Sequence, residues 1–195
     1  MSPGIVLRLL ALGAIWGSSF LFMRITVPAI GVGGTAAGRL IIAALAMFLL
    51  LRALGRRLDW RTRWRDYLIV GLLASGLPFA LFAFAARHLP AGYSAVLNST
   101  VPMFAVLISW LSLRAPPSVS KLLGVLAGIA GVATLAGFGS LQMDAGVLAG
   151  FAACLLAALM YALAAVQIRQ RFGGADPLVV AGGSMLAAAL ALSPA

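Results

Sequence analysis

The sequence predicts an all-helical protein that crosses a membrane several times. Of its 195 residues, 63% are hydrophobic and only 9% are charged, whereas charged residues make up about 25% of a soluble domain. The apolar residues come in long runs, and a helix needs about 20 such residues to cross the hydrocarbon layer. Because lipid offers no hydrogen bonds to the backbone, helices are the natural structure for runs that are apolar on all sides.

Seven apolar runs have about the length of one span each. The first ends in Phe22-Met23-Arg24 rather than at a small-residue cleavage site, which predicts a retained helix and not a signal peptide. The third contains Pro78, which is expected to kink its helix. The runs cover Ile5–Phe22, Gly34–Leu51, Tyr67–Ala86, Gly92–Leu113, Leu122–Phe138, Gly146–Ile168 and Pro177–Ser193.

The positive charges predict the orientation of these spans. The net charge is +10, and the basic residues are concentrated in alternate loops, which the positive-inside rule assigns to the cytoplasm. The amino terminus is therefore expected to be cytoplasmic, in a multi-pass protein of the inner membrane. The loop between the second and third runs holds six arginines beside Trp60 and Trp64, a pattern typical of an anchor near anionic lipid rather than of a nucleic-acid site. The residues assigned to the cytoplasmic side are Arg8, Arg52, Arg56, Arg57, Arg61, Arg63, Arg65, Arg114, Lys121, Arg169 and Arg171.

The few chemically active residues argue against an enzyme. Cys154 is the one cysteine and His88 the one histidine, so neither a disulfide framework nor a His- or Cys-based metal centre is expected. A serine nucleophile needs its base within hydrogen-bond reach. Ser75 lies thirteen residues from His88, about 20 Å away if the stretch is helical, so this pair is too far apart. No cofactor is predicted, and the expected partners are the lipid bilayer and a small-molecule substrate.

An internal repeat appears when the sequence is shifted by 145 residues. Trp16 then aligns with Tyr161 and Gly38 with Gly183, within apolar runs and loops of equal length. One repeat holds five spans, an odd number, so the second copy must enter the membrane upside down. Inverted repeats are typical of secondary transporters. We expect a first repeat over 1–145, the first two helices of a second over 146–195, and a full length near 290 residues, so that the chain is incomplete.

Several motifs resemble those of EamA-type transporters in the drug/metabolite transporter superfamily. Helix one carries Trp16-Gly17-Ser18-Ser19-Phe20, helix two carries Arg39, and helix four carries the stretch Ala95–Pro102. The resemblance implies ten helices in two inverted five-helix repeats and the movement of small metabolites, often amino-acid export. This chain departs from the family in lacking an acidic residue after helix four and in ending after helix seven. The leading interpretation is an exporter of small metabolites that works by alternating access. The alternative is a non-transporting membrane subunit or an inactive fragment that needs a partner.

The candidate substrate-binding residues are polar or aromatic side chains inside the spans. Arg39 offers a fork of donors for the carboxylate of an amino-acid-like solute, or else extends to the outer interface or bonds backbone carbonyls. None of the four acids lies in mid-span, so proton coupling through a buried carboxylate has no candidate here. Pro102 cannot bond the carbonyl of Asn98, so the polar side chains there either bind solute or bond neighbouring helices. The six candidates are Trp16, Ser19, Arg39, Asn98, Ser99 and Tyr161.

Small residues also recur at four-residue spacing, for example Gly13 with Gly17 and Gly146 with Gly150. Such pairs let helices approach closely. Packing within one chain is the main expectation, and a homodimer interface is an alternative that stays open.

Overall fold

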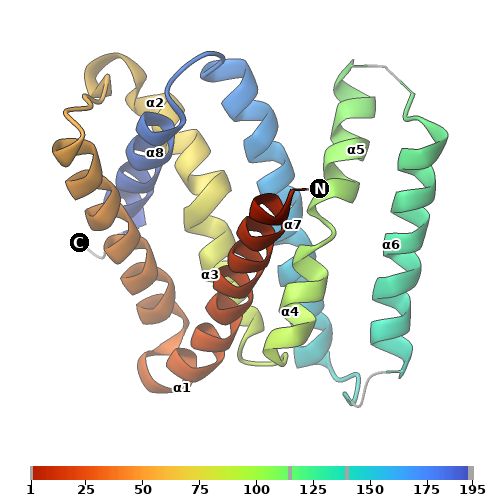
Figure 1. Cartoon of the computed structure of the whole chain (residues 1–195). Coiled ribbons are helices and arrows are strands. Elements are labelled where there is room, and N and C mark those ends of the chain that lie inside the picture. Colours follow the sequence, from red (N-terminus) through yellow and green to blue (C-terminus); the bar gives the residue numbers. More distant parts are fainter. Residues whose placement is uncertain (1, 114–115, 139–140, 193–195) are drawn as a thin grey trace.

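The computed structural model describes residues 2–113, 116–138 and 141–192, and every regular element within these ranges is a helix (Figure 1). Arg114 and Ser193, which the sequence analysis placed in a loop and at the end of a span, lie outside the described residues. The elements are α1 (Pro3–Ala53), α2 (Trp60–Gly71), the π-helical turn η1 (Leu72–Gly76), α3 (Leu77–Ala85), α4 (Ala91–Asn98), α5 (Val101–Leu113), α6 (Val119–Phe138), α7 (Ala145–Arg171) and α8 (Pro177–Leu192).

The helices have the lengths and compositions that a polytopic membrane protein requires. Four helical segments are long and apolar enough to cross a membrane, namely Gly4–Ala53, Trp60–Ala85, Ala91–Leu111 and Ala145–Arg171. Val119–Thr134 and Pro177–Leu192 are shorter apolar helices. Because the first segment has 50 residues and folds back on itself, it accounts for two of the predicted runs. The all-helical membrane fold class is thus confirmed.

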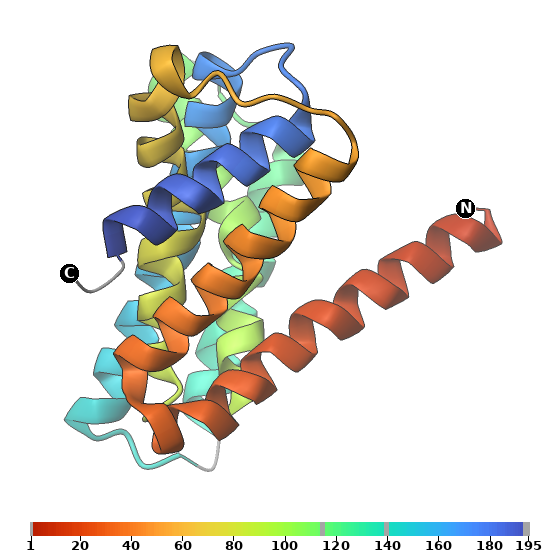
Figure 2. The ribbon, with the colours of Figure 1, turned by 90° about the vertical axis from the view of Figure 1, so that its left-hand side faces the viewer.

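The long helix α1 consists of two arms joined at Gly31. This residue has φ 75° and ψ 175°, a backbone conformation that glycine alone adopts at little cost. Pro28 just before it contributes no amide hydrogen to the helix. The start of the first arm (3–30) leans away from the other helices (Figure 2) and is exposed from residue 4 to residue 17, whereas Phe20, Met23 and Val27 further along it are buried in the core. The second arm (32–53) packs against α8.

The core lies where α3 and α7 pack against each other. Phe82 of α3 and Cys154 of α7 are almost fully buried, as is Leu89 in the turn after α3. The Cys154 Sγ donates to the Ser94 Oγ at 3.7 Å. Helix α8 packs on the other side, against α2 and the second arm of α1. Helix α3 therefore lies between α7 and α1, and one of its faces borders the space between the two arms of α1.

Glycines permit the closest helix contacts. A Cβ added to Gly71 of α2 would lie 2.1 Å from the backbone oxygen of Ser184 in α8, and one added to Gly183 would meet the Tyr67 ring at 2.5 Å. In α7, an added Cβ at Gly150 would lie 2.9 Å from Leu89. Gly13, by contrast, has no atom within 4 Å of its added Cβ. Packing within the chain therefore uses some of the small-residue pairs, and a homodimer stays a prediction.

The third span is not a regular α-helix. Its middle is the π-helical turn η1, which directly precedes the α-helical residues around Pro78. Such turns insert an extra residue into a helix and commonly occur at functional sites. The kink expected at Pro78 stays a prediction, and Ala74 and Ser75 within the π-helical turn line the cavity described below.

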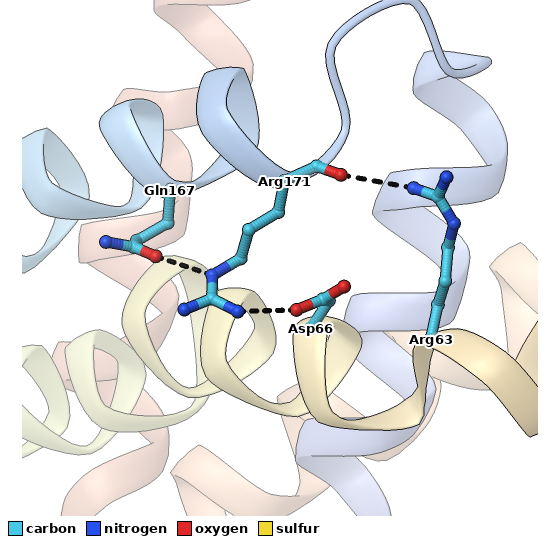
Figure 3. A network of polar contacts seen from close by, with 4 residues as sticks. All are labelled: Arg63, Asp66, Gln167 and Arg171. Carbon is cyan, nitrogen blue, oxygen red and sulfur yellow. Dashed lines mark hydrogen bonds and ion pairs between the residues drawn. The ribbon is translucent and has the colours of Figure 1, made fainter.

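A polar network ties the start of the third span to the end of α7 (Figure 3). The Arg171 side chain donates to the Asp66 carboxylate at 2.5 Å and to the Gln167 amide oxygen at 2.6 Å. Arg63 donates to the Arg171 carbonyl oxygen at 3.1 Å. Partly exposed ion pairs contribute only about 0–1 kcal/mol each. The main effect of the network is therefore to hold the start of the third span beside the end of α7. It brings basic residues of two predicted cytoplasmic segments to one end of the molecule.

Candidate functional site

A cavity of about 810 Å³ lies between the two arms of α1, with η1, α3, α4, α7 and α8 completing its wall. This volume falls within the range of small-molecule sites, roughly 300–1,000 Å³. Aromatic rings form much of the lining. Phe20 and Phe82 meet edge to face with ring centroids 5.1 Å apart, and Phe82 stacks on Tyr161 at 6.1 Å. The cavity exists because Gly31 turns α1 back on itself.

Five of the six candidate residues line this one cavity. The first arm supplies Trp16 and Ser19, the second arm Arg39, α4 Asn98 and α7 Tyr161. Ser99 does not line it. Its side chain is exposed, and its hydroxyl donates to the Val96 carbonyl oxygen at 2.6 Å.

The break between α4 and α5 separates Asn98 from the two polar residues that follow it. The Thr100 hydroxyl, like that of Ser99, bonds back to a carbonyl three residues earlier, that of Leu97 at 2.7 Å. Asn98 is 9% exposed, and its amide oxygen has no hydrogen-bond partner in the described part of the chain. The broken helix thus leaves Asn98 as the polar residue of this stretch that lines the cavity described above.

Arg39 is held on the cavity wall by contacts that leave most of its donors unused. Its guanidinium carbon lies 4.0 Å from the centroid of the Phe79 ring, a cation–π arrangement. One Nη donates to the Met23 sulfur at 3.6 Å, a weak acceptor. A guanidinium has five N–H donors. The contact with Met23 occupies one of them and the Phe79 ring covers one face, so the other donors are left for a ligand.

The cavity carries positive charge without a matching acid. The protein has four acidic residues, and none of them lines the cavity. Asp66 and Asp176 pair with Arg171 and Arg56, and Asp144 accepts from the Val147 amide at the start of α7. Positive charge in an apolar enclosure attracts anions strongly, because the low dielectric weakens screening. Arg39 therefore gives the cavity a net attraction for anionic groups.

Sequence reasoning missed Thr35, Ser75, Phe79 and Phe82, all of which line the cavity. Thr35 lies four residues before Arg39, and helical spacing alone could have placed both on one face of the second arm. The positions of Ser75 and the two phenylalanines depend on η1 and on how α3 packs against α1. No spacing within the sequence indicates that arrangement.

Comparisons with known proteins agree with this architecture. Residues 3–137 match the EamA-like transporter family. An uncharacterized transporter of Bacillus subtilis, YoaV, is 27% identical over 173 residues, which cover 88% of this chain and 59% of that protein. A probable terminal-alkyne amino-acid exporter of Streptantibioticus cattleyicolor is 30% identical over 124 residues, 62% of this chain and 41% of that protein.

A second Bacillus subtilis protein, the uncharacterized transporter YvbV, is 29% identical over 142 residues, 72% of this chain and 45% of that protein. The chain thus spans about two fifths to three fifths of the length of these relatives. No solved structure matches it. With more than half of its residues matched by the family and its apolar helices in place, the chain is a multi-pass membrane protein that belongs to the EamA-like transporter family.

Proposed function

We propose that the protein is a secondary transporter that exports small metabolites such as amino acids across the inner membrane by alternating access. The observation that carries the proposal is the aromatic-walled cavity with the unpaired Arg39 on its wall. One of the relatives is named as a probable amino-acid exporter. Inverted repeats, which we propose over 1–145 and from 146 onward, give two halves that can rock around such a site.

The substrate would bind with its carboxylate on Arg39 and its body against the aromatic rings. Guanidinium forks recognise carboxylates through two parallel hydrogen bonds. Asn98 and Tyr161, from α4 and α7, would contact the remaining polar atoms, while Trp16 and Ser19 lie on the first arm of α1. Because residues 4–17 of the first arm are exposed, this part of the arm is the wall that we expect to move between inward-open and outward-open states.

Transport by the full chain in proteoliposomes tests this proposal. We expect vesicles that contain the protein to exchange internal for external amino acids with apolar or aromatic side chains, at rates well above those of empty vesicles. Cationic solutes without a carboxylate, such as phenethylamine, should not exchange, because the cavity offers them no acid. If no carboxylate-bearing solute in the panel exchanges faster than in empty vesicles, the transporter assignment fails and the non-transporting subunit becomes the better interpretation.

The orientation is a separate expected result. Loops rich in arginine and lysine are retained on the cytoplasmic side, so a cysteine placed at the exposed Arg57 should react with an impermeant maleimide only after the cells are opened. A cysteine at the exposed Arg87, beyond α3, should react in intact cells. Because Cys154 is buried, the background should be low. Labelling of both positions from the same side would contradict the proposed topology.

A further inference from the structure

Thr35 carries a buried hydroxyl that no group within the described parts of the chain satisfies. The residue is 6% exposed and lines the cavity, and among the described residues its Oγ1 has no hydrogen-bond partner. A buried polar group without a partner costs about 1–3 kcal/mol. Because this group lies beside a cavity, a bound ligand is a natural source of its missing hydrogen-bond partner.

The reason for this unusual state is the turn at Gly31. A threonine inside a helix ordinarily bonds its hydroxyl to the carbonyl four residues earlier. Thr26 does so with Phe22 at 2.9 Å, and Thr134 with Ala130 at 2.8 Å. The residue four before Thr35 is Gly31, whose ψ of 175° turns its carbonyl out of the helical direction. The kink that forms the cavity therefore also removes the acceptor four residues before Thr35.

Thr35 also lies one helical turn from Arg39 on the second arm. Residues four apart occupy the same face of a helix, about 5–6 Å between Cβ atoms, and both line the same cavity. Gly38, between them on the cavity wall, has no atom within 4 Å of an added Cβ, so space is open beside the pair. The face thus carries one hydroxyl and one guanidinium beside the same cavity, with the Thr35 Oγ1 itself covered.

We propose that Thr35 and Arg39 together form a two-point site for the carboxylate of the transported solute, an inference that rests on the proposed function. The Thr35 hydroxyl donates to one carboxylate oxygen, and the guanidinium donates to both. The Oγ1 atom is covered in the present conformation, so the ligand engages it after rotation about χ1. Threonine in helices has two accessible χ1 rotamers, which makes this rotation a small rearrangement.

The test compares three variants of the full chain in their affinity for phenylalanine, with phenylalaninamide as the probe that lacks the carboxylate. Thr35→Val removes the hydroxyl at nearly constant volume, and Thr35→Ser retains it. Thr134→Val is the matched control, because its hydroxyl is bonded to Ala130 on an exposed face of α6, away from the cavity. Affinity and exchange are measured in proteoliposomes, and thermal unfolding is measured on the same samples.

We expect Thr35→Val to weaken phenylalanine binding on the order of 10- to 100-fold, the usual effect of losing a hydrogen bond to a charged group. Thr35→Ser and Thr134→Val should stay within about threefold of the wild type. The thermal midpoint of Thr35→Val should not fall, because the substitution removes an unsatisfied buried hydroxyl. A merely structural role for Thr35 would instead lower that midpoint.

The outcomes separate the two proposals. Equal phenylalanine affinity in Thr35→Val and the wild type would overturn the two-point site and leave the transporter standing. An equal loss for phenylalanine and phenylalaninamide would also overturn it, since the hydroxyl would then not act on the carboxylate. A wild type that neither binds nor exchanges phenylalanine or any other carboxylate-bearing solute would overturn both.

Discussion

Replacing Arg39 by alanine is expected to abolish transport of carboxylate-bearing solutes while leaving the protein in the membrane. Among the residues that the structure describes, Arg39 is the one arginine that lines the cavity, and no acid faces it there. Loss of two charge-assisted hydrogen bonds in a low-dielectric site reduces binding on the order of 100-fold or more. Exchange of radiolabelled phenylalanine in proteoliposomes measures the effect, with protein recovered from the membrane fraction as the measure of insertion.

Two further variants show whether the charge or the shape of Arg39 matters. Arg39→Lys keeps the charge but replaces the planar fork by a point charge, so we expect partial activity with a raised KM. Arg87→Ala removes an exposed arginine outside the cavity and should behave as the wild type. Wild-type exchange by Arg39→Ala would mean that Arg39 serves only to contact Phe79 and Met23, and the carboxylate site would have to lie elsewhere.

Adding one methyl group at Gly71 is expected to disrupt the packing of α2 on α8. The new Cβ would lie 2.1 Å from the Ser184 carbonyl oxygen and 2.9 Å from its carbon. Both are backbone atoms, so no rotation of a side chain relieves the overlap and the helices must separate. Overpacking typically costs about 1–3 kcal/mol of folding free energy, occasionally more. A cost at the upper end is expected here, because the overlapping atoms belong to the backbone. We expect Gly71→Ala to lower the thermal midpoint sharply and to reduce the yield of folded protein in detergent.

The matched control is Gly131→Ala in α6. An added Cβ at Gly131 has no atom within 4 Å, and alanine is favoured over glycine in a helix by about 1 kcal/mol. Its thermal midpoint should therefore equal or slightly exceed that of the wild type. If Gly71→Ala unfolds at the same temperature as Gly131→Ala, α2 and α8 do not make this close contact in the membrane.

Several features could be read from the sequence because they depend on local composition. The length of an apolar run and the number of such runs follow from hydropathy alone, and the structure places a helical segment on each of them. The family also followed from motifs such as Trp16-Gly17-Ser18-Ser19-Phe20. Five of the six candidate residues line one cavity, which agrees with the rule that polar groups inside a span face the interior of the bundle or a cavity. That they bind substrate stays a prediction, as do the inverted repeat and the cytoplasmic amino terminus.

The sequence itself determined the class of protein, its spans and the types of residue at the site, since these depend on the apolar and polar character of single stretches. Other features depended on contacts between residues far apart in the chain. Only the tertiary structure showed that Gly31 folds α1 into two arms, that Ser99 faces away from the cavity, and that Thr35 loses its helical acceptor beside Arg39. In lipid no hydrophobic force selects which apolar faces meet, so close packing and hydrogen bonds decide the arrangement. Those interactions depend on the shapes of both partners, which a pattern within one helix does not contain.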